Sequence, residues 1–239
     1  MKAMEKEAIR KTVWRLLEER GVARFPRPAE GRIPNFVGAE KAAKLLKTSK
    51  SYESADVIKV NPDSPQRPVR ETALMDGKTL VMPTPRIGEG FLMVRGNSLS
   101  KYMAHHASSI SGMYRVGRSV DIRAMPHVDL IVVGSVAVSR DGWRLGKGEG
   151  YAELEYAMLR DAGVVDGSTP VYTTVHDLQL VDEIPHTVHD LPVDTIFTNT
   201  SVIECPKQPK PTGIIWDMLD KSKISEIPPL ALMYGRRRF

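Results

Sequence analysis

The chain has 239 residues, 41% of them hydrophobic, and 34 Lys and Arg against 29 Asp and Glu give a net charge of +5. This composition is typical of a globular protein with one dominant core, and its modest positive charge favours anionic ligands without requiring nucleic acid. The sequence has no apolar run of about 18 residues and no signal-type segment, and it has a single cysteine, so it predicts a cytoplasmic protein without membrane span or internal disulfide.

The N-terminal region predicts a helix followed by an extended segment. Residues 3–20 have the apolar stripe of an amphipathic helix, which ends at Gly21. Lys6 and Arg10 lie at the edge of that stripe, so both side chains can reach a cleft between the helix and the body. Residues 25–36 contain too many prolines for a helix and predict an extended strap that packs on the body.

The following part of the chain alternates between strand and helix patterns. Helices are expected at residues 39–48, 69–75, 98–109 and 151–162. Strands are expected at residues 57–60, 79–82, 130–133, 171–175 and 195–198. Residues 130–133 are apolar on both faces, as parallel strands are, so the sequence predicts an α/β fold with a mainly parallel sheet.

The C-terminal part has a different composition. We expect an α/β domain over residues 1–205 and a second segment over residues 206–239. That segment begins with a linker rich in proline and lysine, and the stretch with Trp216 and Met218 is expected to fold back onto the domain. The basic run at residues 236–238 is usually a solvated tail, and it also permits a weaker hypothesis of RNA association.

A glycine-rich loop is the most informative motif of the chain. Gly146, Gly148 and Gly150 alternate with other residues and lead straight into an expected helix. Arg144 and Lys147 flank them. Glycine permits positive φ and close backbone approach, a helix N-terminus offers unpaired N–H groups, and the cations add positive charge, so the motif predicts phosphate binding. The alternative is a strand-to-helix turn with solvated cations.

Two common phosphate fingerprints do not match this loop. The dinucleotide fingerprint needs Gly-x-Gly-x-x-Gly, whereas the spacing here is Gly-x-Gly-x-Gly. The P-loop needs Ser or Thr after its lysine, whereas Lys147 is followed by Gly148.

Several segments together match a known family. They are Lys6 with Arg10 and residues 77–83, 129–133, 142–151 and 189–198. On these segments the chain resembles the ATP-dependent 5-formyltetrahydrofolate cyclo-ligase family over nearly its whole length. It resembles most the methenyltetrahydrofolate synthetase domain-containing subgroup, through residues 25–28, 32–36, 83–86 and 148–152.

The resemblance implies both a fold and a reaction. The fold is a Rossmann-like three-layer fold of the kind found in ribose-phosphate isomerases and coenzyme A transferases. The reaction is the ATP-dependent conversion of 5-formyltetrahydrofolate to 5,10-methenyltetrahydrofolate with release of ADP and phosphate. ATP phosphates would lie on the glycine loop and on the two basic residues of the first helix, with Mg²⁺ nearby.

The resemblance also implies site residues at matching positions. The implied catalytic residues are Arg144, Lys147 and Tyr151. The implied ATP-binding residues are Lys6, Arg10, Gly146, Lys147, Gly148, Glu149, Gly150 and Tyr151. Glu153 stands where the family has a metal-linked aspartate and would contact Mg²⁺ directly or through water.

Two departures from the family pattern concern the folate side. The family's Tyr-Tyr-Asp-Arg is replaced by residues 151–154, Tyr-Ala-Glu-Leu, which removes an aromatic ring and a cation. The glutamate expected to hold the pterin has no clear counterpart among Lys59, Val60 and Asn61. A second hypothesis therefore stays open, namely a nucleotide- or phosphometabolite-binding protein of the same fold without cyclo-ligase activity, with RNA association as a further option.

Other reactive side chains give weaker signals. His186 and His189 have prolines nearby that disfavour helical ligand spacing, so no metal site is expected there. Cys205 has no neighbouring histidine and is not expected to be a nucleophile. Arg32 and Arg86 lie beside prolines in turns and are candidate contacts for an anion.

Overall fold

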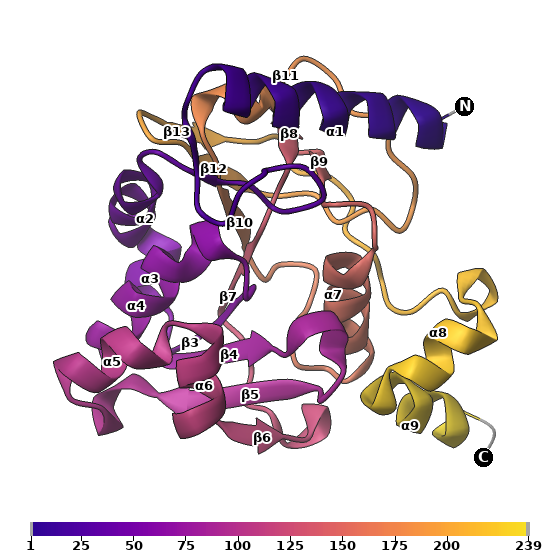
Figure 1. Cartoon of the computed structure of the whole chain (residues 1–239). Coiled ribbons are helices and arrows are strands. Elements are labelled where there is room, and N and C mark those ends of the chain that lie inside the picture. Colours follow the sequence, from indigo (N-terminus) through magenta and orange to yellow (C-terminus); the bar gives the residue numbers. More distant parts are fainter. Residues whose placement is uncertain (1, 238–239) are drawn as a thin grey trace.

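The computed structural model describes residues 2–237, and its centre is an eight-stranded sheet (Figure 1). In spatial order the strands are β13 (Val202–Glu204), β12 (Thr195–Phe197), β10 (Val171–Thr174), β7 (Leu130–Val133), β3 (Val57–Val60), β4 (Thr79–Pro83), β5 (Phe91–Arg95) and β6 (Arg118–Val120). The run from β12 to β4 is parallel, and β13, β5 and β6 pair antiparallel at the two edges. The predicted α/β fold with a mainly parallel sheet is confirmed.

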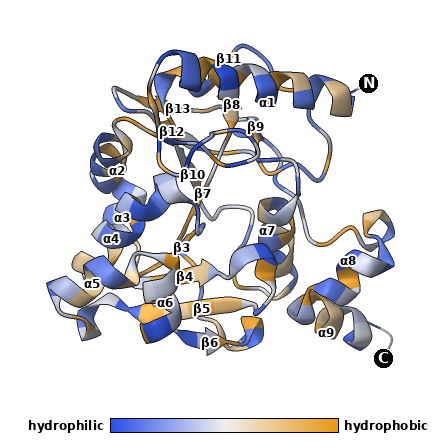
Figure 2. Ribbon diagram, in the orientation of Figure 1, coloured by the Kyte–Doolittle hydropathy of each residue, from blue (hydrophilic) through white to orange (hydrophobic). Residues whose placement is uncertain are grey.

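Strand β7 shows why its sequence is apolar throughout. Leu130 and Val132 belong to one core cluster, whereas Ile131 and Val133 belong to another on the opposite face. Successive side chains of a strand point to opposite faces, so a strand covered by helices on both sides needs no polar positions. Apolar residues likewise mark β4 and β5 in Figure 2.

Five helices cover the first face of the sheet. They are α2 (Ala39–Lys47), α3 (Lys50–Ser54), α4 (Arg67–Met75), α5 (Lys101–Ala107) and α6 (Ile110–Val116). The helix predicted at residues 98–109 is present as the shorter α5, and α6, which the sequence did not predict, follows it directly. The hydroxyls of Ser100 and Ser109 accept hydrogen bonds from the backbone N–H groups of Met103 and Gly112, and each serine therefore starts a helix of its own.

The second face is covered by α7 (Tyr151–Asp161) and by two C-terminal helices, α8 (Lys221–Glu226) and α9 (Pro228–Arg236). Ile224, Ile227 and Leu230 are buried in the same core cluster as Leu154 of α7. Burial of these apolar side chains holds α8 and α9 beside α7 (Figure 1).

A third core lies beyond the carboxyl ends of the parallel strands. Here α1 (Lys2–Glu19) packs on a small sheet of β11 (Leu180–Val181), β8 (Ala137–Ser139) and β9 (Arg144–Leu145). Val13 and Leu17 of α1 are buried in this core with Trp143. The helix predicted at residues 3–20 is therefore confirmed, and it lies over the strand that leads into the glycine loop (Figure 1).

The proline-rich strap closes back on itself at its two ends. Strand β1 (Ala23–Arg24) pairs antiparallel with β2 (Asn35–Phe36), and the peptide bonds before Pro26 and Pro28 are cis. The indole N–H of Trp14 donates to the carbonyl of Arg32 at 2.9 Å, which ties the strap to α1.

The other sequence expectations have mixed outcomes. The five predicted strands and the helices at residues 39–48, 69–75 and 151–162 are confirmed to within two residues at each boundary. Strands β5, β6 and β13 were missed. Strands β6 and β13 are short and largely exposed and have no apolar pattern, whereas β5 is apolar and mostly buried. No helix within residues 2–237 is both long enough and apolar enough to cross a membrane.

The basic run at the end of the chain is only partly described. The Arg237 guanidinium lies 5.7 Å from the centre of the Trp216 ring, whereas Arg238 lies outside the described residues. RNA association stays a prediction from sequence.

Candidate functional site

A cavity opens where the order of the parallel strands changes direction. From β3 the chain continues to β4 on one side, and later returns to β7 on the other side of β3. Open α/β sheets bind ligands at such a switch point, outside the carboxyl ends of the strands. A cavity of about 400 Å³ lies there, and the residues that follow the three strands line it, namely Asn61, Asp63, Thr84, Arg86 and Gly134.

The glycine loop forms another wall of this cavity. Gly148 and Gly150 have φ of +104° and +71°, so both need the freedom of glycine, whereas Gly146 does not. Gly150 is the residue before the first turn of α7. Lys147, Glu149 and Tyr151 line the cavity with the loop, so the helix N-terminus opens onto it.

Arg10 braces the loop from α1. Its Nε donates to the carbonyl of Gly146 at 2.7 Å, and its Nη1 pairs with Glu7 at 3.1 Å. A Cβ on Gly148 would lie 3.5 Å from the guanidinium carbon of Arg10. The predicted approach of Arg10 from the first helix is therefore seen, and it ends on the loop backbone.

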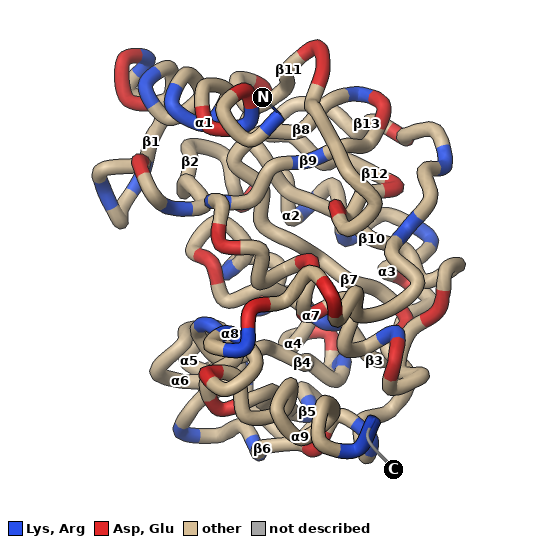
Figure 3. Tube along the Cα trace, turned by 90° about the vertical axis from the view of Figure 1, so that its right-hand side faces the viewer, with Lys and Arg blue, Asp and Glu red and all other residues tan. Residues whose placement is uncertain are grey.

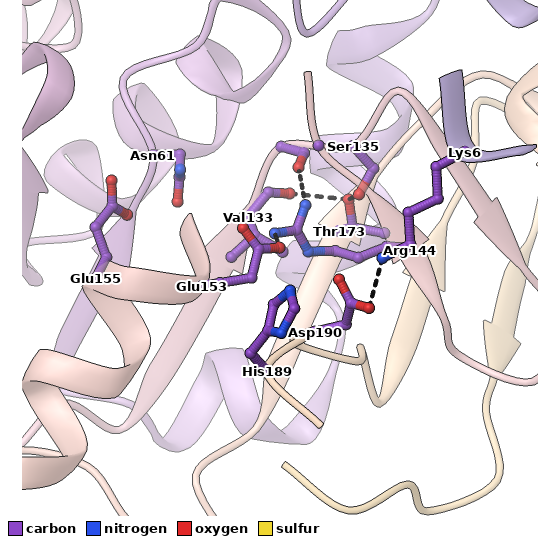
Figure 4. A network of polar contacts seen from close by, with 12 residues as sticks. Lys6, Asn61, Val133, Ser135, Arg144, Glu153, Glu155, Thr173, His189 and Asp190 are labelled. Atoms are coloured by element: carbon purple, nitrogen blue, oxygen red, sulfur yellow. Dashed lines mark hydrogen bonds and ion pairs between the residues drawn. The ribbon is translucent and has the colours of Figure 1, made fainter. Parts of the chain in front are cut away.

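Lys6 reaches a different partner. Its Nζ pairs with the carboxylate of Asp190 at 2.6 Å, and Asp190 also accepts from the backbone N–H of Thr187 at 2.7 Å (Figure 4). Burial acts to raise the pKa of Asp190, but Lys6 and Thr187 outweigh it and hold the pKa below its usual value of 3.8. Lys6 is thus held by a buried carboxylate, and the residues that line the cavity include neither Lys6 nor Asp190.

Arg144 is buried at the centre of the site. Its Nη1 donates to the carbonyl of Gly134 at 2.9 Å, and its Nη2 pairs with Glu153 (Figure 4). Its side chain is 0% exposed, and within residues 2–237 its Nε has no hydrogen-bond partner. Arg144 therefore connects the end of β7 to α7 and retains one unsatisfied donor.

Charges at the mouth of the cavity are more exposed. Lys147 pairs with Glu149 at 2.8 Å, and Arg86 lies 3.5 Å from the same carboxylate. The side chains of Lys147 and Glu149 are 37% and 36% exposed. Ion pairs of this exposure stabilise a protein by at most about 1 kcal/mol. An anion that enters the cavity can therefore replace Glu149 as the partner of Lys147.

Comparison with known proteins assigns this architecture. Residues 2–199 match the model of the 5-formyltetrahydrofolate cyclo-ligase family. The chain belongs to this family. The methenyltetrahydrofolate synthase domain-containing protein of Mus musculus is 43% identical over 242 residues, which cover 98% of this chain and 64% of that protein. The Homo sapiens protein of the same name is 41% identical over 243 residues, which cover 98% and 63%.

The chain thus spans less than two thirds of the length of these relatives. A solved structure shows the same fold at lower identity. The NMR structure of 5,10-methenyltetrahydrofolate synthetase from Aquifex aeolicus has a TM-score of 0.52 and 20% identity, with 85% of this chain and 94% of that chain covered. The predicted family and fold are therefore confirmed.

A buried polar network at the base of the cavity was not predicted from the sequence. Lys59 donates to the side-chain oxygen of Asn61 at 2.7 Å and pairs with Glu155 of α7. Lys59 and Glu155 are 1% and 3% exposed. Lys59, Asn61 and Asp63 alternate along the chain, and such a pattern at the end of a buried strand could have indicated a polar face.

Two carboxyl groups of this cavity base have altered acidity. Burial raises the pKa of Asp63, against the opposing effect of Lys147 and other cations. Burial also raises the pKa of Glu155, against the effect of Lys59. Such shifts are frequent at functional sites, and both groups line the cavity.

The remaining candidates lie in varied surroundings. Arg32 lines the cavity, as Arg86 does. The His186 ring stacks on Trp143 with 3.8 Å between ring centres, and no group of three or more His, Cys, Asp or Glu within residues 2–237 is arranged to hold a metal ion. Burial raises the pKa of the Cys205 thiol to about 11, which disfavours the reactive thiolate.

Proposed function

We propose that this chain is an ATP-dependent cyclo-ligase that converts 5-formyltetrahydrofolate to 5,10-methenyltetrahydrofolate with release of ADP and phosphate. One observation supports this most: a loop with two positive-φ glycines and flanking cations opens, together with the N-terminus of α7, onto a cavity at the switch point of the sheet. Family membership supplies the class of reaction.

ATP binding is assigned to the loop and its cations. The loop backbone and the N-terminus of α7 would receive the phosphates, with Lys147 as the mobile cation. Arg10 keeps the loop in place through the Gly146 carbonyl. The unsatisfied Nε of buried Arg144 adds a donor that an anion in the cavity could satisfy.

The chemistry needs little more than positioning and neutralisation of charge. The formyl oxygen of the folate attacks the γ-phosphorus, and the bond from that phosphorus to the leaving oxygen of ADP breaks. The ring-closing N–H nitrogen then attacks the formyl carbon and loses its proton, the bond from that carbon to the phosphorylated oxygen breaks, and phosphate leaves with that oxygen. In this proposal Arg144 and Lys147 neutralise the developing negative charge, while Tyr151 orients the reacting groups at the start of α7.

Mg²⁺ is proposed to accompany ATP at Glu153. Magnesium sites in such enzymes use one or two carboxylates together with phosphate oxygens and water, so one protein carboxylate is sufficient. Glu153 lines the cavity and is 15% exposed, and its pairing with Arg144 keeps it in a single position. Held by Glu153, Mg²⁺ would neutralise part of the phosphate charge of ATP.

The pterin end of the folate is proposed to contact the cavity base. A pterin ring presents paired N–H donors, which carboxylates recognise well. Asp63 and Glu155 both line the cavity, and Figure 4 shows Glu155 beside the amide of Asn61. Asp63 follows β3. It would bind the pterin in place of the family's glutamate, which has no clear counterpart among Lys59, Val60 and Asn61.

The central prediction concerns Lys147. Loss of a hydrogen bond to a charged group costs about 1.5–3 kcal/mol, so Lys147→Ala should weaken Mg-ATP binding about tenfold or more. Calorimetric titration measures the affinity, and absorbance of the methenyl product together with phosphate release measures turnover. Lys44→Ala, an exposed lysine on α2, is the matched control and should leave both unchanged.

The outcomes separate the two functional hypotheses. ATP binding that depends on Lys147 without methenyl product would favour the nucleotide-binding alternative over the ligase. Folded protein that shows no heat with Mg-ATP would overturn both.

A further inference from the structure

A lysine from the C-terminal segment touches the glycine loop. Lys223 lies in α8, beyond residue 199, where the family match ends. Its Nζ donates to the carbonyl of Glu149 at 2.6 Å and lies 4.9 Å from the centre of the Tyr151 ring. A Cβ on Gly150 would lie 3.8 Å from the same nitrogen. Lys223 therefore contacts the junction between the loop and α7 at three successive residues.

The position of Lys223 is held by packing of its own helix. Ile224 is 7% exposed, and Ile227 and Leu230, which follow it, are 1% and 0% exposed. These side chains belong to the core cluster that contains Leu154 of α7. The helix is thus fixed against α7, so the lysine needs little further ordering to reach the loop.

Lys223 differs from the other cations around the loop in its partners. Lys6, Arg10, Arg144 and Lys147 each pair with a carboxylate. Within residues 2–237 no carboxylate lies within ion-pairing distance of Lys223, and the Glu149 carbonyl takes one of its three N–H groups. Figure 3 shows the basic residues of α8. A charge not neutralised by a carboxylate thus lies at the N-terminus of α7, where an anion is favoured.

The hydrogen bond also controls the direction of a loop peptide. The carbonyl of Glu149 and the N–H of Gly150 belong to one planar trans peptide and point in opposite directions. Because Lys223 holds the carbonyl on the side of α8, the N–H of Gly150 faces away from that helix. Glu149 and Gly150 both line the cavity.

We propose that Lys223 is a positioning residue of the phosphate site, so that the C-terminal segment completes a site whose other residues come from the family-matched part of the chain. This inference rests on the proposed function of the loop as the ATP phosphate site. Lys223 acts through the Glu149 carbonyl and through the positive charge it places behind the loop.

The test compares Lys223→Ala, Lys223→Arg and Lys221→Ala in the full chain. Lys221 is exposed on the same helix and is the matched control. We expect Lys223→Ala to raise the Kd for Mg-ATP about tenfold and to raise KM for ATP without changing KM for 5-formyltetrahydrofolate. Lys223→Arg should recover part of the affinity, because it retains the charge and a donor.

A second measurement does not require nucleotide. Hydrogen exchange of the amides of residues 148–151 should be faster in Lys223→Ala than in wild type or Lys221→Ala. Equal ATP affinity of wild type and Lys223→Ala, or equal exchange at these amides, would overturn the role of Lys223. Wild-type protein that binds no ATP would instead overturn the proposed function, and that result is separate from the comparison of exchange rates.

Discussion

At the scale of single residues, Lys6, Arg144 and Lys147 differ in how deeply the carboxylate partner of each is buried. Lys6 meets Asp190 and Arg144 meets Glu153, both in surroundings with little solvent. Removing one partner of a buried pair leaves the other charge without compensation, which is costly. The exposed pair of Lys147 with Glu149 lacks this penalty, and Lys147 is therefore the cation best able to change partner.

The Lys6–Asp190 pair predicts a specific dependence of stability on pH. The pKa of Asp190 is lower in the folded state than its usual value of 3.8, so its stabilising effect is present above that pH and is lost as pH falls through the folded pKa. Asp190→Asn should therefore lower the free energy of unfolding by about 1–3 kcal/mol near pH 7 and by much less in acid. Urea unfolding at a series of pH values measures the difference.

The control for this measurement is Asp182→Asn, since Asp182 is exposed. A cost of Asp190→Asn that is the same at every pH would contradict an ionised Asp190 paired with Lys6.

At the scale of elements, the phosphate site is a junction between a short strand and a helix. The loop leaves β9, turns through Gly148 and Gly150, and enters α7, with α1 on one side and α8 on the other. The N–H groups of such a loop bind a phosphate tightly only if the loop backbone already has its final conformation before the ligand binds. The positive φ of both glycines is the local condition for that shape.

Gly148→Ala should disturb this junction. An alanine at φ +104° is strained by about 1 kcal/mol or more, and its Cβ would lie 3.5 Å from the Arg10 guanidinium carbon. We expect a lower melting temperature and weaker Mg-ATP binding, measured by differential scanning fluorimetry and calorimetry. Gly167→Ala is the matched control, because Gly167 has no positive φ and no atom within 4 Å of its Cβ position. Equal behaviour of the two variants would refute the requirement for glycine at residue 148.

At the scale of the whole molecule, the buried apolar side chains form three cores. The two faces of the sheet and the layer beneath α1 each bury their own cluster of apolar residues. The C-terminal helices share the second of these clusters with α7. We therefore expect α8 and α9 to unfold together with the sheet.

Leu230→Ala tests this expectation. Leu230 is 0% exposed, and a leucine-to-alanine change in a core costs about 2–5 kcal/mol. The variant should unfold in one transition at a lower temperature than wild type. Circular dichroism at 222 nm during heating measures this transition. Leu232→Ala on the same helix is the control, because Leu232 is 61% exposed and should have little effect. An early separate transition of the C-terminal helices would contradict a shared core.

The strands and helices that were predicted correctly are those whose sequence pattern is local, contained within a few consecutive residues. Residues 130–133 are apolar throughout, and the glycines before α7 follow a short spacing. The separate helix α6 was missed because side-chain capping by Ser109 ends the preceding helix and starts a new one, and apolar periodicity does not report such capping. The edge strands have no strong local pattern of their own, since they depend on a neighbouring strand for their hydrogen bonds.

The amino-acid sequence by itself determined the family, the alternating α/β pattern and the loop with its glycines and cations, because these depend on residue type and short spacing. Only the tertiary structure decided which partner each charge meets. Lys6 and Asp190 are 184 residues apart, and Lys223 and Glu149 are 74 apart. Lys59 and Glu155 likewise meet across the sheet and α7. Such contacts depend on how the layers pack. Packing brings together residues far apart in the chain, and no local sequence pattern indicates which of them will meet.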